Sequence, residues 1–179
     1  MFGWPLVTID FEASGLSAGA YPIEVGVCVW RGPGEPLFGW SSLIKPLAAW
    51  SDHGDWCETA EAVPCIPRTQ LDGGIEPSQV LLTLNTILDD GGIGWCDGVP
   101  FDVGWARKLS RAADARPTFR IGHLDMLTAK LDLDAYKRMA SWLDAIEPAH
   151  RARADAERLM QRLARGLGIE HGPILDIDL

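Results

Sequence analysis

The sequence predicts an α/β fold in which a mixed β-sheet of five strands is flanked by α-helices. The 179 residues suffice for one substantial core and leave little room for a second domain. Segments rich in strand-forming residues alternate with segments whose apolar residues recur at helical spacing. Apolar and charged residues make up 47% and 23% of the chain, as in an ordinary globular protein. Residues 1–179 are therefore expected to form one domain.

Three strands are expected in the first part of the chain. Residues 5–12 mix β-branched and apolar side chains and stop at Ala13-Ser14-Gly15, a turn signal. A second strand is expected at 23–30. Residues 31–36 are dense in glycine and proline, and the apolar run 37–44 completes a hairpin with the second strand. The first strand thus gains antiparallel partners.

The remaining chain alternates between helices and short strands. Residues 48–74 show no clean period, so loops with short helical turns are expected there. Pro77 begins a segment with apolar residues at helical spacing that ends at Gly91-Gly92. The later predicted elements are a strand at 93–96, a helix at 101–113, a strand at 119–121, a partly helical region at 124–143 and a helix at 148–167. This order is typical of a mixed sheet with helices on its faces.

The charge distribution limits the kind of partner. The net charge is −9, which argues against a long polyanion, because affinity for nucleic acid comes largely from Lys and Arg. However, residues 1–100 contain only 3 of the 16 Lys and Arg residues, so the basic side chains are concentrated in the C-terminal part. A short, end-bound substrate suits this charge better than a long duplex.

The sequence contains no apolar run long enough to span a membrane and no basic, apolar leader. A soluble, cytoplasmic protein without membrane partners is therefore expected, and a homodimer is left open. The four cysteines are irregularly spaced, which favours free thiols. A zinc site on His53, Cys57 and Cys65 is an alternative, although no paired C-x-x-C supports it.

Four acidic residues stand where chemistry is expected. Asp10 and Glu12 are two residues apart on a predicted strand, so both carboxylates point to the same side of the sheet. In an apolar strand such a pair would repel unless a cation neutralised it, whereas at a solvated strand end it needs no ligand. Asp102 follows the strand at 93–96 and could equally cap a helix. Asp155 lies among arginines and, taken alone, is more often a surface ion-pair partner than a ligand.

Taken together, these residues resemble the motifs of the DEDDh family of 3′-to-5′ exonucleases, within the ribonuclease-H-like superfamily. Ile9-Asp10-Phe11-Glu12-Ala13-Ser14-Gly15-Leu16 is similar to the family's D-x-E-x-[ST]-G-L. Phe101-Asp102 is similar to the F-D of its second motif, and His150 and Asp155 have the H-x4-D spacing of its third. The resemblance covers most of the chain and implies a ribonuclease-H-like fold.

The resemblance also implies an activity and a set of site residues. Asp10, Glu12, Asp102 and Asp155 would hold two divalent cations, Mg²⁺ or Mn²⁺, and His150 would be the general base. The partner would be the 3′ end of DNA or RNA, cut to 5′-mononucleotides. Ala13 and Leu16 after the first strand would contact substrate, with Leu16 as an apolar wedge. Trp105, as an aromatic residue near Asp102, is a candidate for stacking on a base.

Two departures from the family pattern and one geometric problem qualify this interpretation. Asp97-Gly98 stands where the second motif often begins with His-Asn, and Pro64-Cys65-Ile66 replaces a middle-region His-Gly-Ile. His150 and Asp155 are about 140° apart on an ideal helix, so His150 is expected in an irregular helix start near Pro148. A catalytically inactive ribonuclease-H-like module that binds nucleic acid or acts as a scaffold is the alternative function.

Overall fold

The sheet of this protein has six strands in the order β5-β4-β1-β2-β3-β6. The structure is a computed structural model, which describes residues 3–89, 91–129, 131–143 and 149–178. β1 pairs antiparallel with β2 and parallel with β4, which in turn pairs parallel with β5. The strands are β1 (Leu6–Ala13), β2 (Pro22–Trp30), β3 (Leu37–Leu43), β4 (Ile93–Cys96), β5 (Arg120–His123) and β6 (Ile174–Asp176). The C-terminal ends of β1, β4 and β5 therefore meet at one edge of the sheet.

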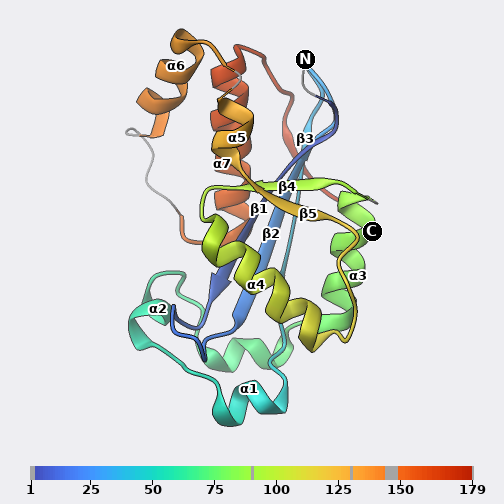
Figure 1. Cartoon of the computed structure of the whole chain (residues 1–179), viewed down its shortest axis with the longest axis vertical. Helices are drawn as coiled ribbons and strands as arrows, with labels where there is room; N and C mark the ends of the chain where they lie inside the picture. Colours follow the sequence, from blue (N-terminus) through green and yellow to red (C-terminus); the bar gives the residue numbers. More distant parts are fainter. Residues whose placement is uncertain (1–2, 90, 130, 144–148, 179) are drawn as a thin grey trace.

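Helices cover both faces of the sheet (Figure 1). The α-helices are α1 (Ala48–His53), α2 (Glu58–Ala62), α3 (Pro77–Leu88), α4 (Val99–Ala112), α5 (Leu124–Thr128), α6 (Leu133–Leu143) and α7 (Ala152–Leu167), with a 3₁₀ helix η1 (Arg68–Gly73). Short helices thus fill the 48–74 region, as predicted. In Figure 1, α4 crosses in front of the sheet and α6 packs against α7 at one side. None of the helices in the described ranges is long and apolar enough to cross a membrane.

The core divides into layers according to the alternation of side chains along β1. Val7, Ile9 and Phe11 belong to a cluster with apolar residues of α3 and α4. Leu6 belongs to a second cluster with residues of α5 and α7. Because side chains alternate along a strand, Asp10 and Glu12 project to the α7 side, as Leu6 does.

α7 lies unusually close to the sheet. The Thr8 hydroxyl donates a hydrogen bond of 2.6 Å to the Ala156 carbonyl on α7. At Gly26 on β2, a Cβ atom would overlap the backbone of Ala152 and Arg153. Glycine at this position is therefore what lets the first turn of α7 rest directly on β2, beside Asp10 and Glu12.

The fold differs from the sequence prediction at three places. The predicted five-stranded sheet has a sixth strand, β6, which was missed because it has only three exposed residues at an edge. α3 ends at Leu88 rather than at Gly91. α7 begins at Ala152 rather than at 148, because His150 has a φ of 52°, which is incompatible with a helix. The expected role of Pro148 concerns a position outside the described residues.

Candidate active site

Three carboxylates converge at the C-terminal end of β1. Oxygen atoms of Asp10, Glu12 and Asp155 all lie within 4.8 Å of one another, a spacing that a single metal ion can bridge. Asp10 and Glu12 share one face of β1, and the close packing of α7 on the sheet brings Asp155 to them. Together with His150 and Asp97, the three acids line a cavity of about 250 Å³.

Asp102 approaches this cluster from the other side of the sheet. It lies in the first turn of α4 and is only 4% exposed. Its negative charge raises the pKa of Asp10, so the two carboxyl groups are near neighbours. The Cys96 thiol and the backbone amides of Phe11 and Gly98 donate hydrogen bonds to the Asp102 carboxylate and fix its position. Asp102 adjoins the three converging acids without lining their cavity.

Asp10, Glu12 and Asp102 hold their protons more tightly than free carboxyl groups do, because the pKa of each is raised. Burial raises the pKa of Asp10 well above its ordinary value, and the charges of Asp102 and Glu12 raise it further. Burial and the charge of Asp155 raise the pKa of Glu12 to about 7. Burial also raises the pKa of Asp102 to about 6, against the opposing effect of its hydrogen bonds. Carboxylates that destabilise one another in this way fit divalent cations, which favour several oxygen ligands and remove the repulsion.

His150 enters the cavity from the segment that precedes α7. Its φ of 52° places it in the left-handed region, where non-glycine residues are uncommon and where functional sites store strain. His150 precedes the first residue of α7, Ala152. The separation of about 140° that an ideal helix would impose on His150 and Asp155 therefore does not apply. His150, Glu12 and Asp155 therefore face one cavity although they come from different segments.

Glu24 holds the start of α7 and was not identified from the sequence. Its buried carboxylate accepts hydrogen bonds from the Arg151 guanidinium at 3.0 and 2.7 Å and from the Ala152 amide at 3.0 Å. Arg151 is the N-cap residue of α7. The available signal was an acid in the middle of the otherwise apolar strand Pro22–Trp30, which needs a partner.

Arg158 is the arginine that forms an ion pair with Asp155, the alternative that the arginines around this acid had suggested. Its Nε donates a 3.1 Å hydrogen bond to Asp155, and its side chain lines the cavity. Within a helix, residues at i and i+3 are neighbours, so this pair was accessible from the spacing. Arg158 brings a positive charge to a cavity otherwise surrounded by acids.

The loop after β1 presents Leu16 to solvent. Leu16 is 74% exposed, which is unusual for a large apolar side chain. The loop is anchored by Ser14, whose hydroxyl donates to the Asp55 carbonyl at 2.7 Å and accepts from the Tyr21 amide at 3.0 Å. Ala13, half-buried, follows Glu12 at an irregularity in the pairing of β1 with β2. Ala13 is thus the next residue after Glu12 on β1, and Leu16 lies on the loop that follows.

The expectation that Trp105 stacks on a base is corrected by its burial. Trp105 is 6% exposed and belongs to the core cluster between α4 and the sheet. The exposed aromatic residue of α4 is Phe101, at 48%, immediately before Asp102.

The zinc alternative gains no support from the geometry. Cys57 and Cys65 are both exposed, and neither belongs to a group of converging metal ligands among the described residues. In the ranges that the structure describes, the acids at the end of β1 form the candidate metal centre.

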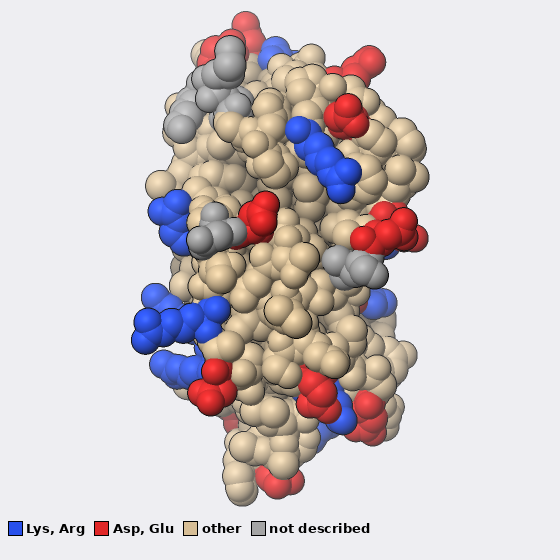
Figure 2. Space-filling model, turned by 90° about the vertical axis from the view of Figure 1, so that its right-hand side faces the viewer, with Lys and Arg blue, Asp and Glu red and all other residues tan. Residues whose placement is uncertain are grey.

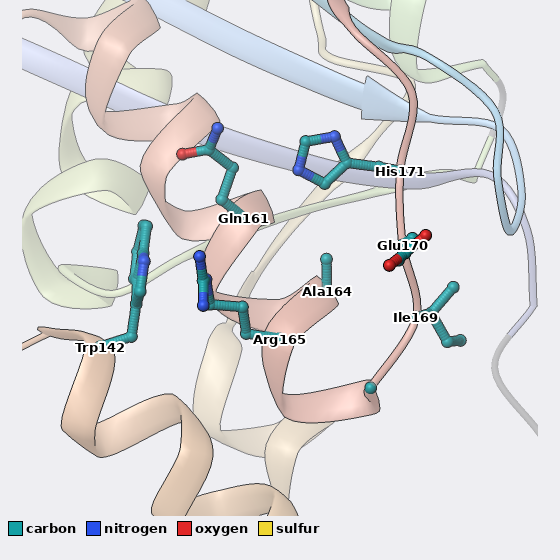
Figure 3. A pocket seen from close by; sticks show the side chains of 8 residues that line it. Trp142, Gln161, Ala164, Arg165, Ile169, Glu170 and His171 are labelled. Atoms are coloured by element: carbon teal, nitrogen blue, oxygen red, sulfur yellow. The ribbon is translucent and has the colours of Figure 1, made fainter.

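A larger cavity, of about 550 Å³, lies at the other end of α7 (Figure 3). Figure 3 shows Trp142 of α6 opposite Gln161 and Arg165 of α7, with His171 on the chain that follows α7. Glu170 is the one carboxylate in its lining. This cavity therefore lacks the acid cluster that a two-metal site requires.

Comparison with known proteins shows which solved structures have a similar fold. Neither a protein-family model nor a curated protein matches the sequence. A 3′-exonuclease, solved in its recognition of the 3′ end of the histone mRNA stem-loop, matches with a TM-score of 0.68 and 12% identity over 92% of this chain and 81% of that chain. Cell-death related nuclease 4 matches with a TM-score of 0.56 and 15% identity, over 92% of this chain and 64% of its own. The expected ribonuclease-H-like fold is therefore confirmed, and the chain shares it with two nucleases.

Proposed function

We propose that this protein is a metal-dependent 3′-to-5′ exonuclease that acts on single-stranded or short DNA or RNA and releases 5′-mononucleotides. The observation that carries the proposal is the convergence of Asp10, Glu12 and Asp155 within 4.8 Å. The likeness of the fold to two nucleases, one of them a 3′-exonuclease that recognises an RNA 3′ end, supports it.

Asp10, Glu12, Asp102 and Asp155 would hold two divalent cations, Mg²⁺ or Mn²⁺. Bound there, the cations would acidify the attacking water and neutralise charge on the phosphodiester oxygens. The four carboxylates supply oxygen ligands of the kind that both metals prefer. The charges of Asp102, Glu12 and Asp155 all raise the pKa of Asp10, so Asp10 would be a ligand close to each of the other three acids.

His150 would accept the proton of the attacking water. It lines the same cavity as Asp10 and Glu12, so a water there lies within reach of the imidazole. Histidine is the side chain whose charge ordinarily changes near neutral pH, which suits a general base. Arg158, on the same cavity, would offer a positive charge to the phosphate.

The form of the cavity favours a chain end over an internal position. Its volume of about 250 Å³ is below the range typical of pockets for larger ligands. Two exposed apolar side chains lie near site residues in the sequence: Leu16 on the loop after β1 and Phe101 immediately before Asp102. We infer that these two contact the terminal nucleotide, since apolar and aromatic side chains pack against unpaired bases.

The proposal is tested with 5′-labelled single-stranded DNA and RNA oligonucleotides in Mg²⁺. Products that shorten stepwise from the 3′ end, with release of nucleoside 5′-monophosphates, are expected. Asp10→Asn should abolish the products, whereas Asp114→Asn, a matched change on the exposed loop after α4, should not. Cutting of a closed circular strand would contradict an exonuclease. Binding without hydrolysis would instead favour the inactive nucleic-acid-binding module.

A further inference from the structure

Three arginines line a further cavity, which is separate from the acidic cluster and from the cavity at the other end of α7. Arg107 and Arg111 are exposed on α4, and Arg120 is the first residue of the neighbouring strand β5. With Ser110 they line a cavity of about 480 Å³. The same cavity is lined by the apolar side chains of Val103, Ala106, Phe119 and Ile121. It thus combines an apolar floor with guanidinium groups.

The net charge of the chain is −9, so three arginines around one cavity stand out against an acidic background. Among the residues that the structure describes, Arg151, Arg153 and Arg158 form ion pairs with acids, whereas Arg107, Arg111 and Arg120 form none. On the face shown in Figure 2, several Lys and Arg side chains gather at the left edge. Like charges around one cavity repel, so a polyanionic ligand would stabilise this arrangement.

The arginines lie along the helix that begins at the acidic cluster. Arg107 and Arg111 follow Asp102 by roughly 7 and 13 Å along the axis of α4, at 1.5 Å per residue. Between Asp102 and Arg107, a Cβ atom at Gly104 would meet open space, so the surface of the helix is open at that position. Phosphates of a stacked strand are about 3.4 Å apart, which places the arginines two to four nucleotides from the cluster.

We propose that the nucleic-acid strand upstream of the 3′ end lies along the outer surface of α4, with its phosphates on Arg107, Arg111 and Arg120. The guanidinium groups give bidentate contacts to phosphate, and a base packs against the apolar floor near Phe119 and Ile121. The position of the 3′ end rests on the proposed function, but the binding surface itself does not. A strand must be about five nucleotides long or longer to reach from the acidic cluster to all three arginines, at about 3.4 Å per nucleotide.

The test neutralises the three arginines together, as Arg107→Gln, Arg111→Gln and Arg120→Gln. A matched control, Arg31→Gln, Lys137→Gln and Arg165→Gln, removes the same charge from exposed positions elsewhere. Binding of a fluorescent single strand of about 12 nucleotides is measured by anisotropy in excess chelator. Three lost contacts should weaken binding by roughly 10- to 100-fold at about 0.1 M salt and lower the slope of log Kd against log salt by about 2. The control should bind like wild type.

The activity of the triple variant on long and short substrates distinguishes the loss of an upstream contact from general damage to the enzyme. For the 12-mer in Mg²⁺, the triple variant should show a raised KM and an unchanged kcat, whereas a dinucleotide too short to reach the arginines should be hydrolysed normally. Circular dichroism melting checks the fold, and the single variant Arg120→Gln, with a proportionally smaller effect, replaces the triple variant if it unfolds.

Several outcomes would overturn the inference. These are equal 12-mer affinity of the triple and control variants, equal impairment on the dinucleotide, and competition by poly-glutamate as strong as by the 12-mer. A wild-type protein that fails to bind the 12-mer overturns it too. Failure of the proposed function is recognised separately, because the wild type would then bind the 12-mer, lose affinity through the triple variant and hydrolyse nothing.

Discussion

Asp155 accepts hydrogen bonds from the backbone amides on both sides of His150. Its carboxylate oxygens lie 3.3 Å from the Ala149 nitrogen and 3.2 Å from the Arg151 nitrogen. The acid that converges with Asp10 and Glu12 thus also supports the left-handed conformation of His150, whose φ is 52°. The position of the imidazole and the acidic cluster therefore depend on one carboxylate.

Replacing His150 by alanine should lower kcat by roughly 10² to 10⁴, with little change in KM, because the proton acceptor is lost while the acids stay in place. Steady-state kinetics on a single-stranded oligonucleotide measure both constants. His53→Ala and His171→Ala serve as controls and should retain activity, since neither residue lines the acidic cavity. Wild-type kcat in His150→Ala across neutral pH would refute the general-base role.

Glu24→Gln should destabilise the protein by about 2 kcal/mol or more, because it removes the negative partner of Arg151 from a buried site. The start of α7 would loosen, and kcat should fall with it. Urea unfolding measures the change in free energy. The control is Glu76→Gln, whose ion pair with Lys45 is about half exposed, and it should change stability far less, because solvent screens an exposed pair. Similar stabilities of the two variants would count against this role of Glu24.

Asp102→Ala should abolish turnover, whereas Asp97→Ala should retain a substantial part of it. Both carboxyl groups are close enough to raise the pKa of Asp10. Asp102 is buried and oriented by hydrogen bonds, whereas Asp97 is exposed and well solvated. Single-turnover rates of the two variants in Mg²⁺ show which of the two acids catalysis requires. An equal loss in both would mean that Asp97 also serves as a ligand.

In excess chelator the protein should become less stable as the pH rises from about 5 to 8. The pKa of Glu12 is about 7 and that of Asp102 about 6, both above their ordinary values. The folded state therefore binds more protons than the unfolded state in this window, and stability falls as they dissociate. Thermal melting at several pH values measures the fall.

Mg²⁺ should reverse this destabilisation at the upper end of the pH range. At about 100 times its Kd it would raise Tm by roughly 5 to 10 °C. The Glu12→Gln variant should show a flatter pH profile in chelator, because one of the titrating groups is gone. A Tm that rises with pH in chelator, or is insensitive to Mg²⁺, would contradict the metal-site interpretation.

Local sequence pattern predicted what depends on local geometry. The period of a strand places Asp10 and Glu12 on one face, and turn signals delimit the first three strands. The approach of Asp155 was supplied by the resemblance, because it depends on long-range packing of α7 on Gly26 and Thr8. Local periodicity in the sequence cannot predict a contact between segments that lie so far apart in the chain.

Two misjudged features have different causes. Trp105 could have been assigned to the core, because it is one helical turn from the apolar residue Leu109 and so shares a face of the helix with it. The strand β6 could not have been predicted, because three exposed residues carry no strand pattern. They form a strand only by pairing with β3.

The most direct test of the acidic cluster is a calorimetric titration of the metal-free protein with Mn²⁺. Two cations per chain are expected for the wild type, with binding abolished or reduced to one weak site in Asp10→Asn, which removes one of the four proposed ligands. Asp114→Asn should bind like wild type. Absence of Mn²⁺ binding to the wild type, or unchanged binding in Asp10→Asn, would contradict the assignment of Asp10, Glu12, Asp102 and Asp155 as metal ligands.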